Sequence, residues 1–463
     1  MMIDLFIFFR DYRIKDNNGL LETMKTKKNV VPIFVFVDDQ INPQKNEYFS
    51  HNSVQFLCES LFDLNTQLQE YKSELLVFKG PSLTHVLTDI HNIIPIQSIS
   101  FNIDYTPYAL ERSEKIQRWC QYHKSEYNDY QDYLLASMGT FNRLPNIPYN
   151  VYEAFKNNVY KKMDLIQKTK NKNIKNLIQS SSLKKSKYHL KSLSGLFHPN
   201  KTNLVIGGRT HGLKKLKSSN INNYENMRNE LSFNTTQLSA YIKYGCLSIR
   251  EVFWHFHEQN LIGLCDQLIW REFYYYIAFY NPRILKYGES FRQNLNDIKW
   301  KKSKHHYLKW CAGKTGYPII DACMMELNTT GYMHNRGRLI VSNFLNRILG
   351  MDWRQGEKYF ASKLIDYDPC VNNGNWQWIA STGVDTKPYQ QRIFNPWLQS
   401  EKYDKDCKYI KKWLPHLQHI PNKELHNWEK YYSNYDLKEL GYSKPIISYI
   451  QGKKNSIEQY KNI

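Results

Sequence analysis

The sequence predicts a parallel α/β domain followed by an all-helical domain. Three observations support this order. Strand patterns alternate with helical patterns over residues 1–135, residues 136–215 are rich in Lys, Asn and Ser, and residues 216–455 contain almost only helical patterns. Strands that alternate with helices form right-handed βαβ units, and hence a parallel, Rossmann-like sheet. A chain of 463 residues is long enough for two or three domains with large cores.

The predicted sheet contains four clear strand patterns. They are short runs of β-branched and aromatic residues, namely "MIDLFIFF", "VVPIFVFVDD", "ELLVFKG" and "IQSISFNID". Helical patterns such as "FLCESLFDLNTQLQEYKS" lie between them. Residues 5–9 are apolar, but they are too few for the core of a signal peptide and no basic segment precedes them. We therefore expect them to form a buried strand.

The middle segment, residues 136–215, is predicted to be a basic linker between the domains. Its stretch "KKMDLIQKTKNKNIKNLIQSSSLKKSKYHLKS" contains many lysines, and Asp164 is its one acid. Such a composition favours a solvated segment. It also suits a basic strip that follows a DNA backbone.

The second domain is predicted to be helical from its capping signals and apolar patterns. "LSIREVFWHFHEQN" opens with a capping box from Ser248 to Glu251. "LCDQLIWREFYYYIAFY" is apolar on almost every side, so we expect a buried helix that stops before Pro282. "YPIIDACMMELNTTG" and "RGRLIVSNFLNRILG" predict further helices that end at Gly331 and Gly350.

Charge and cysteine usage limit the class of protein. The formal net charge of +20 and the pI of about 9.3 favour a polyanionic partner, most often nucleic acid. No apolar run is long enough to span a membrane. The eight cysteines are scattered without a C-x-x-C pair, which predicts reduced thiols and neither a zinc site nor a disulfide framework. We expect a soluble intracellular protein, whether cytoplasmic or nuclear.

The stretch "DYDPCVNNGNWQWIASTG", residues 366–383, contains acids, amides and two tryptophans close together. Helix capping and core packing explain either half of it alone. Together these groups suit a nucleotide-like redox ligand. Carboxylates can hold ribose hydroxyls or the edge of a heterocycle, and a side-chain amide can hydrogen-bond a redox ring without offering an acidic proton. Indoles can stack on bases or pass electrons to an oxidised ring.

Two further motifs suit phosphate. "NTTQLSAYIKYG", residues 234–245, places hydroxyls at a helix N-terminus, where free N–H groups attract anions, although an ordinary helix cap has the same pattern. "GYMHNRGRLIVSNFLN" places Asn335, Arg336 and Arg338 on one helix. The two arginines point to different faces, so one can pair internally while the other reaches a phosphate.

Several long motifs together resemble the photolyase/cryptochrome superfamily. They are "LIWREF", "GKTGYPIIDACMMELNTTGYMHNRGR", "DWRQGEKYFASKLIDYDPCVNNGNWQWIASTG" and "RIFNP", and the first domain adds "FRDYRIKDNNGL" and "DYTPYALERSEKI". The resemblance covers residues 1–135 and 220–430 and is strongest to class I photolyases that split cyclobutane pyrimidine dimers (CPDs). It implies an α/β antenna domain and a helical domain that holds FAD in a U shape.

The resemblance also implies roles for individual residues around FAD. Asp366 and Asp368 match the acids at the ribose and the flavin, and Arg338 matches the partner of Asp366. Asn372 falls at the position that faces flavin N5, where an amide suits a reduced, anionic flavin. The residues that match the phosphate side of the FAD site are Tyr224, Thr235, Thr236, Gln237, Leu238 and Ser239.

For DNA, the resemblance implies a pocket that receives a flipped-out lesion. Trp270 and Trp378, which we place one strand period after Trp376, match its walls, and Asn335 and Gln267 match residues that face the dimer. The residues expected to hold flanking phosphates are Arg228, Arg336 and Arg392. The electron-transfer chain is matched by Trp300, Trp353 and Trp376. No metal is implied.

The implied activity is light-driven splitting of cyclobutane pyrimidine dimers in damaged DNA, by electron transfer from reduced FAD, in a monomeric enzyme. Four positions depart from the family pattern. Gln267 stands where the family has Glu, Leu339 where it has Met, Leu264 where it has Trp, and Gln237 where it has a basic residue. Because Gln is usual at position 267 in proteins that repair (6-4) lesions, that activity stays open, and so does a photoreceptor without repair. The resemblance leaves open whether a second chromophore, an antenna, is bound. It could be a folate, a deazaflavin or another pigment, or there could be none.

Overall fold

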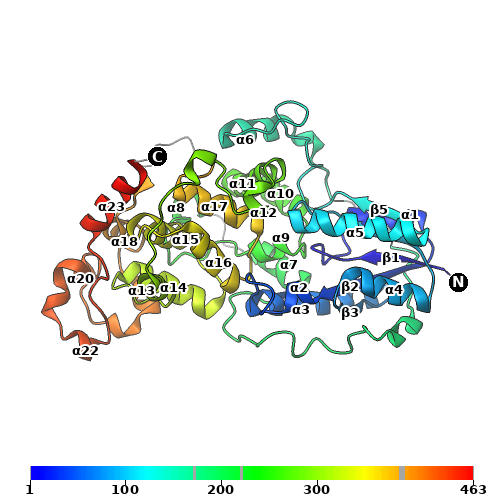
Figure 1. Cartoon of the computed structure of the whole chain (residues 1–463), viewed down its shortest axis with the longest axis horizontal. Helices are drawn as coiled ribbons and strands as arrows, with labels where there is room; N and C mark the ends of the chain where they lie inside the picture. The colour runs from blue at the N-terminus through cyan, green and yellow to red at the C-terminus, as the bar shows by residue number, and fades with distance from the viewer. Residues whose placement is uncertain (1, 170–173, 219–222, 385–391, 462–463) are drawn as a thin grey trace.

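The computed structural model describes residues 2–169, 174–218, 223–384 and 392–461. Figure 1 shows an α/β half, which contains the N-terminus, beside a larger helical half, which contains the C-terminus. The predicted order of a parallel α/β domain followed by a helical part is confirmed. No helix in the described ranges is long and apolar enough to cross a bilayer.

The sheet has five parallel strands in the order β3-β2-β1-β4-β5. Four of them match the predicted strands, and β5, one of the two edge strands, is the strand that the sequence patterns did not reveal. Its sequence, EYNDY, is polar and partly exposed, so it lacks the apolar run by which a buried strand is detected. The strands are β1 (Ile3–Ile7), β2 (Val30–Val37), β3 (Leu76–Gly80), β4 (Ile96–Asn102) and β5 (Glu126–Tyr130).

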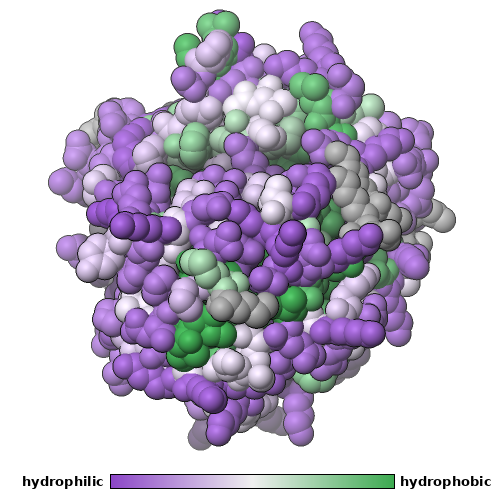
Figure 2. All heavy atoms as spheres, turned by 90° about the vertical axis from the view of Figure 1, so that its right-hand side faces the viewer, coloured by the Kyte–Doolittle hydropathy of each residue, from purple (hydrophilic) through white to green (hydrophobic). Residues whose placement is uncertain are grey.

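Alternate residues of β1 belong to two different cores. Leu5 and Ile7 pack on one face of the sheet, while Phe6 and Phe8 pack in a core that continues into the helical half. Figure 2 shows that the face of the molecule at the α/β end is mainly hydrophilic, with a few hydrophobic patches. The helices of this half are α1 (Asn18–Thr26), α2 (Asp38–Ile41), α3 (His51–Gln69), α4 (Leu83–Ile93) and α5 (Pro107–His123).

Residues 136–215, predicted to be a solvated linker, are attached to both halves in their described part. Backbone bonds join Ile178 to Val30 and Lys79 to Tyr188 at the sheet, and its apolar residues, such as Leu190, pack on the core. Four residues of this segment, 170–173, lie outside the described ranges. Its elements are α6 (Tyr152–Lys161), which packs on α11, the short helices η1 (Met163–Leu165) and η2 (Ser181–Lys185), and α7 (Arg209–Ser218).

The helical half contains the two longest predicted helices where expected. Helix α11 ends at Tyr280, before Asn281 and Pro282, and α14 ends at Thr330, where Gly331 caps it with a φ of 65°. The elements up to residue 348 are α8 (Tyr224–Met227), α9 (Ser239–Lys243), α10 (Ile249–Glu258), α11 (Ile262–Tyr280), α12 (Arg283–Lys286), η3 (Gln293–Leu295), α13 (Lys304–Cys311), α14 (Pro318–Thr330), α15 (Asn335–Asn343) and the π-helical turn η4 (Phe344–Ile348).

The remaining elements complete the helical half and end near the C-terminus. They are α16 (Trp353–Lys363), α17 (Pro369–Ala380), α18 (Pro396–Tyr403), α19 (Lys408–Trp413), η6 (Pro415–Leu417), α20 (Asn422–Leu425), α21 (Trp428–Tyr431), η7 (Tyr432–Asn434), α22 (Leu437–Leu440) and α23 (Tyr449–Lys461).

The predicted capping box at α10 is wrong in its second half. Ser248 does cap the helix, because its hydroxyl accepts a bond from the Arg250 N–H. Glu251 does not bond back to Ser248. Its carboxylate instead accepts two bonds of 2.8 Å from Arg209, whose buried guanidinium requires an anionic partner.

Candidate cofactor site

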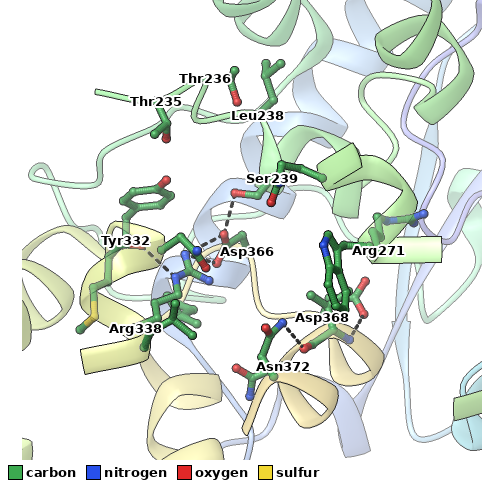
Figure 3. Close-up of a pocket in the computed structure, with 18 of the residues that line it drawn as sticks. Thr235, Thr236, Leu238, Ser239, Arg271, Tyr332, Arg338, Asp366, Asp368 and Asn372 are labelled. Carbon is green, nitrogen blue, oxygen red and sulfur yellow. Dashed lines mark hydrogen bonds and ion pairs between the residues drawn. The ribbon is translucent and has the colours of Figure 1, made fainter. Parts of the chain in front are cut away.

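A cavity of about 600 Å³ lies in the helical half, between the loop before α9 and helices α11, α15 and α17. Figure 3 shows Thr235, Thr236 and Leu238 on one side of this space and Asp368 and Asn372 on the other. The cavity is lined by every residue that the sequence analysis assigns to the site except Trp300, Trp353 and Arg392.

The polar loop before α9 differs from the predicted helix N-terminus. Helix α9 has only five residues and begins at Ser239, so Thr235 and Thr236 lie in the preceding loop. The loop turns at Gln237, whose φ is 53° and whose side chain is almost buried. The loop thus brings hydroxyl groups and one amide to the cavity, and the short helix contributes little dipole.

The predicted pair between Arg338 and Asp366 forms in the lining of the cavity. The Arg338 guanidinium donates to both carboxylate oxygens, at 2.9 and 3.1 Å, and also to the Met333 carbonyl at 2.8 Å. The Ser239 hydroxyl donates to Asp366 at 2.6 Å (Figure 3). Burial lowers the pKa of Arg338, but Asp366 and Tyr332 outweigh that effect and hold it above its usual value, so Arg338 stays charged.

Asp368 joins the cavity to the α/β half. Its carboxylate accepts bonds of 2.7 Å from Arg10 and from the Tyr275 hydroxyl, and one of 3.2 Å from Tyr133. Its second oxygen caps α17. Burial raises the pKa of Asp368, but Arg10 and Arg271 outweigh that effect and hold it below its usual value. The sequence analysis missed Arg10, although a basic residue directly after an apolar strand is a usable signal.

Asn372 is oriented by a buried acid that the sequence analysis also missed. Its amide Nδ2 donates to the Glu357 carboxylate at 3.0 Å and to the Glu357 carbonyl at 3.3 Å. The Glu357 backbone carbonyl can only accept hydrogen bonds, so the amide turns its N–H groups toward Glu357 and is left with Oδ1 as its other polar atom. Tyr367 donates to the same carboxylate at 3.3 Å. Burial raises the pKa of Glu357 to about 7.

The raised pKa of Glu357 predicts that the stability of the fold depends on pH, and the variant Glu357→Gln should remove this dependence. Because the pKa of Glu357 is higher in the folded state, the folded protein binds the proton more tightly, and stability falls as pH rises from about 4.5 to about 7. The Tm of the parent should therefore drop relative to that of Glu357→Gln between pH 5 and pH 8. Thermal unfolding at both pH values measures this difference. A difference that does not change with pH contradicts it.

Two indoles stand at the cavity lining, each backed by another side chain. Trp270 stacks on Tyr152 of α6, with ring centroids 3.5 Å apart and planes 9° apart. The guanidinium of Arg392 lies 3.4 Å from the Trp378 ring centre. Arg392 is 6 % exposed, so it supports Trp378 from behind, and its expected contact with a phosphate stays a prediction. The sequence analysis missed Tyr152 because it lies in the segment assigned to the linker.

Trp376 and Trp378 lie on helix α17, so their expected strand spacing is wrong. Residues two positions apart on a helix point in directions roughly 200° apart, so the two indoles still face different sides. Trp376 is buried and packs on Gly356 of α16, where an added Cβ would lie 2.1 Å from the indole. Trp353 begins the same helix and is fully buried, and Trp300 is half-buried. Trp376 also meets Trp310, at 6.3 Å between ring centroids.

The remaining polar residues lie along the same lining. Arg336 is half-buried, donates to Asn229 at 2.5 Å and lies 4.2 Å from the Tyr403 ring centre. Burial lowers the pKa of Arg336, and the nearby Arg228 lowers it further. Asn335 is exposed, and Gln267 makes only a 3.4 Å bond to the preceding turn of α11. Two neighbouring arginines at a cavity suit an anionic ligand.

Comparisons with known proteins agree with this geometry. Residues 5–174 match the DNA photolyase family model, and residues 264–462 match the FAD-binding domain of DNA photolyase. A deoxyribodipyrimidine photo-lyase of Buchnera aphidicola subsp. Baizongia pistaciae is 30% identical over 496 residues, with 100% of this chain and 98% of the relative covered. The Escherichia coli enzyme of the same name is 40% identical over 235 residues, 49% of each chain.

Solved structures of the same superfamily also superpose on the whole chain. An archaeal photolyase from Sulfolobus tokodaii, described with two FAD molecules, has a TM-score of 0.88 and 34% identity, with 100% of both chains covered. A Synechocystis cryptochrome has a TM-score of 0.89 and 25% identity, with 99% of both chains covered. The chain therefore belongs to the DNA photolyase family, within the photolyase/cryptochrome superfamily. Its cofactor is FAD, as its FAD-binding domain requires.

The residues of the cavity fit FAD. A volume of about 600 Å³ lies within the usual range for ligand pockets, roughly 300–1,000 Å³. One wall offers the hydroxyls and the amide of residues 235–239, which suit a diphosphate, and the other offers the Asn372 amide and the Asp366 carboxylate, which suit a flavin and a sugar. We expect these residues to hold the cofactor.

Proposed function

We propose that this protein splits cyclobutane pyrimidine dimers in DNA under blue or near-ultraviolet light. The observation that carries the proposal is the position of Trp270 and Trp378, two indoles that line the same cavity as the residues that fit FAD. The curated relatives named deoxyribodipyrimidine photo-lyase support it, and so does the net charge of +20. Bound FAD in its reduced form supplies the light absorption and the electron.

The protein's own part in this reaction is to hold, orient and shield. The indoles of Trp270 and Trp378 grip two linked bases that have left the duplex, because a flat apolar face stacks on any base. Tyr152 and Arg392 back these indoles, which keeps their orientation rigid. Such rigidity lowers the entropy cost of placing the lesion beside the cofactor.

Polar residues of the cavity position the two ligands. Asn335 and Gln267 hydrogen-bond the pyrimidine edges, and Arg228 and Arg336 hold DNA phosphates. The pair of Arg338 and Asp366 fixes the cofactor end of the cavity. Glu357 holds the Asn372 amide so that its carbonyl oxygen can accept from flavin N5, which favours the reduced, anionic flavin. A second, light-harvesting chromophore is part of the proposal, without a committed identity.

Two other functions have an observation in their favour. Gln267 lines the cavity where dimer-splitting relatives carry Glu, which favours (6-4) repair. The likeness to a Synechocystis cryptochrome over 99% of both chains favours a photoreceptor without repair. The decisive experiment illuminates reduced, FAD-loaded protein with oligonucleotides that carry either a cyclobutane dimer or a (6-4) lesion. Repair of the dimer is the expected result, and repair of neither lesion would support the photoreceptor.

Gln267→Glu separates the two repair activities. The carboxyl group restores the family's usual contact at nearly the same volume, so the packing cost should be small. We expect the variant to keep or raise cyclobutane-dimer repair, with little change in DNA binding. The assay is light-dependent repair of each lesion at equal FAD content. If the parent instead repairs (6-4) lesions and the variant loses that activity, the dimer assignment is wrong.

Trp270→Ala and Arg336→Ala should affect DNA binding differently. Removing the Trp270 indole strips stacking from the flipped lesion, worth roughly 1–3 kcal/mol per base, and so reduces discrimination for damaged DNA. Removing the Arg336 charge should weaken binding to damaged and undamaged DNA alike, and it should make the affinity less dependent on salt. Titration of both DNAs at two salt concentrations tests this. If Trp270→Ala lowers the affinity for both DNAs equally, the indole serves only to pack the core.

A further inference from the structure

Lys215 lies outside the family motifs but reaches the cofactor cavity through Gln237. It belongs to α7, in the segment first assigned to the linker, and its ammonium donates to the Gln237 side-chain carbonyl. Gln237 lines the cavity, is 9 % exposed, and sits at the left-handed turn of the loop before α9. This contact joins two segments that are 22 residues apart in the sequence.

The charge on Lys215 is not balanced by an acid in the part of the chain that the structure describes. Among the described residues, no carboxylate pairs with its ammonium, and burial alone lowers its pKa. The side chain is half-buried, whereas Lys214, its neighbour on the same helix, is exposed. A partly buried cation without an anion is costly, so a ligand that brings negative charge to this place would stabilise it.

The contact also determines which way the Gln237 amide faces. An ammonium group can only donate hydrogen bonds, so it takes the amide oxygen, and the Nε2 group is left to donate elsewhere. The Ser239 hydroxyl, at the start of α9, already donates to Asp366. An oriented Gln237 therefore provides the loop with a donor for an anion, polarised by the cation behind it.

We propose that Lys215 is a positioning residue of the FAD site, which turns Gln237 to donate to the FAD diphosphate and adds positive charge beside it. The residues on either side of Gln237, 235, 236, 238 and 239, are uncharged, and Lys215 of α7 supplies the cation that contacts Gln237. The inference rests on FAD occupying the cavity and does not depend on which lesion, if any, the protein repairs.

The test measures FAD release from the holoprotein, by the fluorescence that FAD regains on leaving the protein. Lys215→Met should release FAD about tenfold faster than the parent at low salt, as expected for loss of one charge-assisted contact. Added salt should speed release from the parent more than from the variant, because it screens the charge. Lys215→Arg should stay close to the parent. Lys214→Met, which removes an exposed charge from the same helix, is the matched control.

A double-variant cycle shows whether Lys215 acts through Gln237. Gln237→Leu should also speed release, and Lys215→Met should add little to it, because the two residues form one unit. Unchanged release in Lys215→Met would overturn the proposal, as would an equal effect of Lys214→Met or full additivity with Gln237→Leu. If Lys215→Met still lowers the Tm and still speeds FAD release in the Gln237→Leu background, Lys215 acts through folding alone.

Discussion

Asp366→Ala is expected to yield a protein without FAD and with a lower free energy of unfolding. The substitution leaves the Arg338 guanidinium in the cavity without its carboxylate, and it removes the acceptor of the Ser239 hydroxyl. Breaking a buried pair in this way costs roughly 3–5 kcal/mol. The cavity also loses the carboxylate expected to hold the cofactor. FAD content per chain after purification and chemical unfolding measure the two effects.

A matched control separates the two effects of Asp366→Ala. Asp352 also pairs with an arginine, Arg354, and caps α16, but it lies away from the cavity. Asp352→Ala should cost about 1 kcal/mol through the lost cap and keep its FAD. Full FAD content in Asp366→Ala would contradict the assignment of this acid to the cofactor.

Trp376→Phe is expected to block photoreduction of oxidised FAD while chemically reduced protein still repairs DNA. Phenylalanine fills most of the indole's space beside Gly356, but a phenyl ring is far harder to oxidise. On the proposed route, the flavin would therefore lose the residue that passes the electron to it. Illumination of the oxidised holoprotein, followed by absorbance, measures the rate, and repair after chemical reduction measures the remaining activity.

Trp310→Phe is the control for the electron route. Trp310 is as buried as Trp353 and lies 6.3 Å from Trp376, but it is outside the assigned chain of Trp376, Trp353 and Trp300. Its replacement should leave photoreduction close to the parental rate. Loss of photoreduction in Trp310→Phe with retention in Trp376→Phe would move the route to the other indole.

Periodicity predicted the regular elements well because it reports which side of an element is buried. Strands β1 and β2 are fully buried apolar runs, and α11 is apolar on nearly every side, so each carries its own signal. The edge strand β5 was missed because it is polar. The strand spacing assumed between Trp376 and Trp378 was wrong because the two residues continue a helix that begins at the Asp368 cap.

The sequence by itself determined the fold class, the basic character of the chain and, through long motifs, the pair of Arg338 and Asp366 at the site. Only the tertiary structure decided which side chains contact and support the residues of the site. Arg10 binds Asp368 across 358 residues, Tyr152 stacks under Trp270, and Lys215 holds Gln237. Local patterns depend on neighbours a few residues away. A buried charge or ring is matched by whichever side chain the packing brings near, and sequence spacing carries no record of that partner.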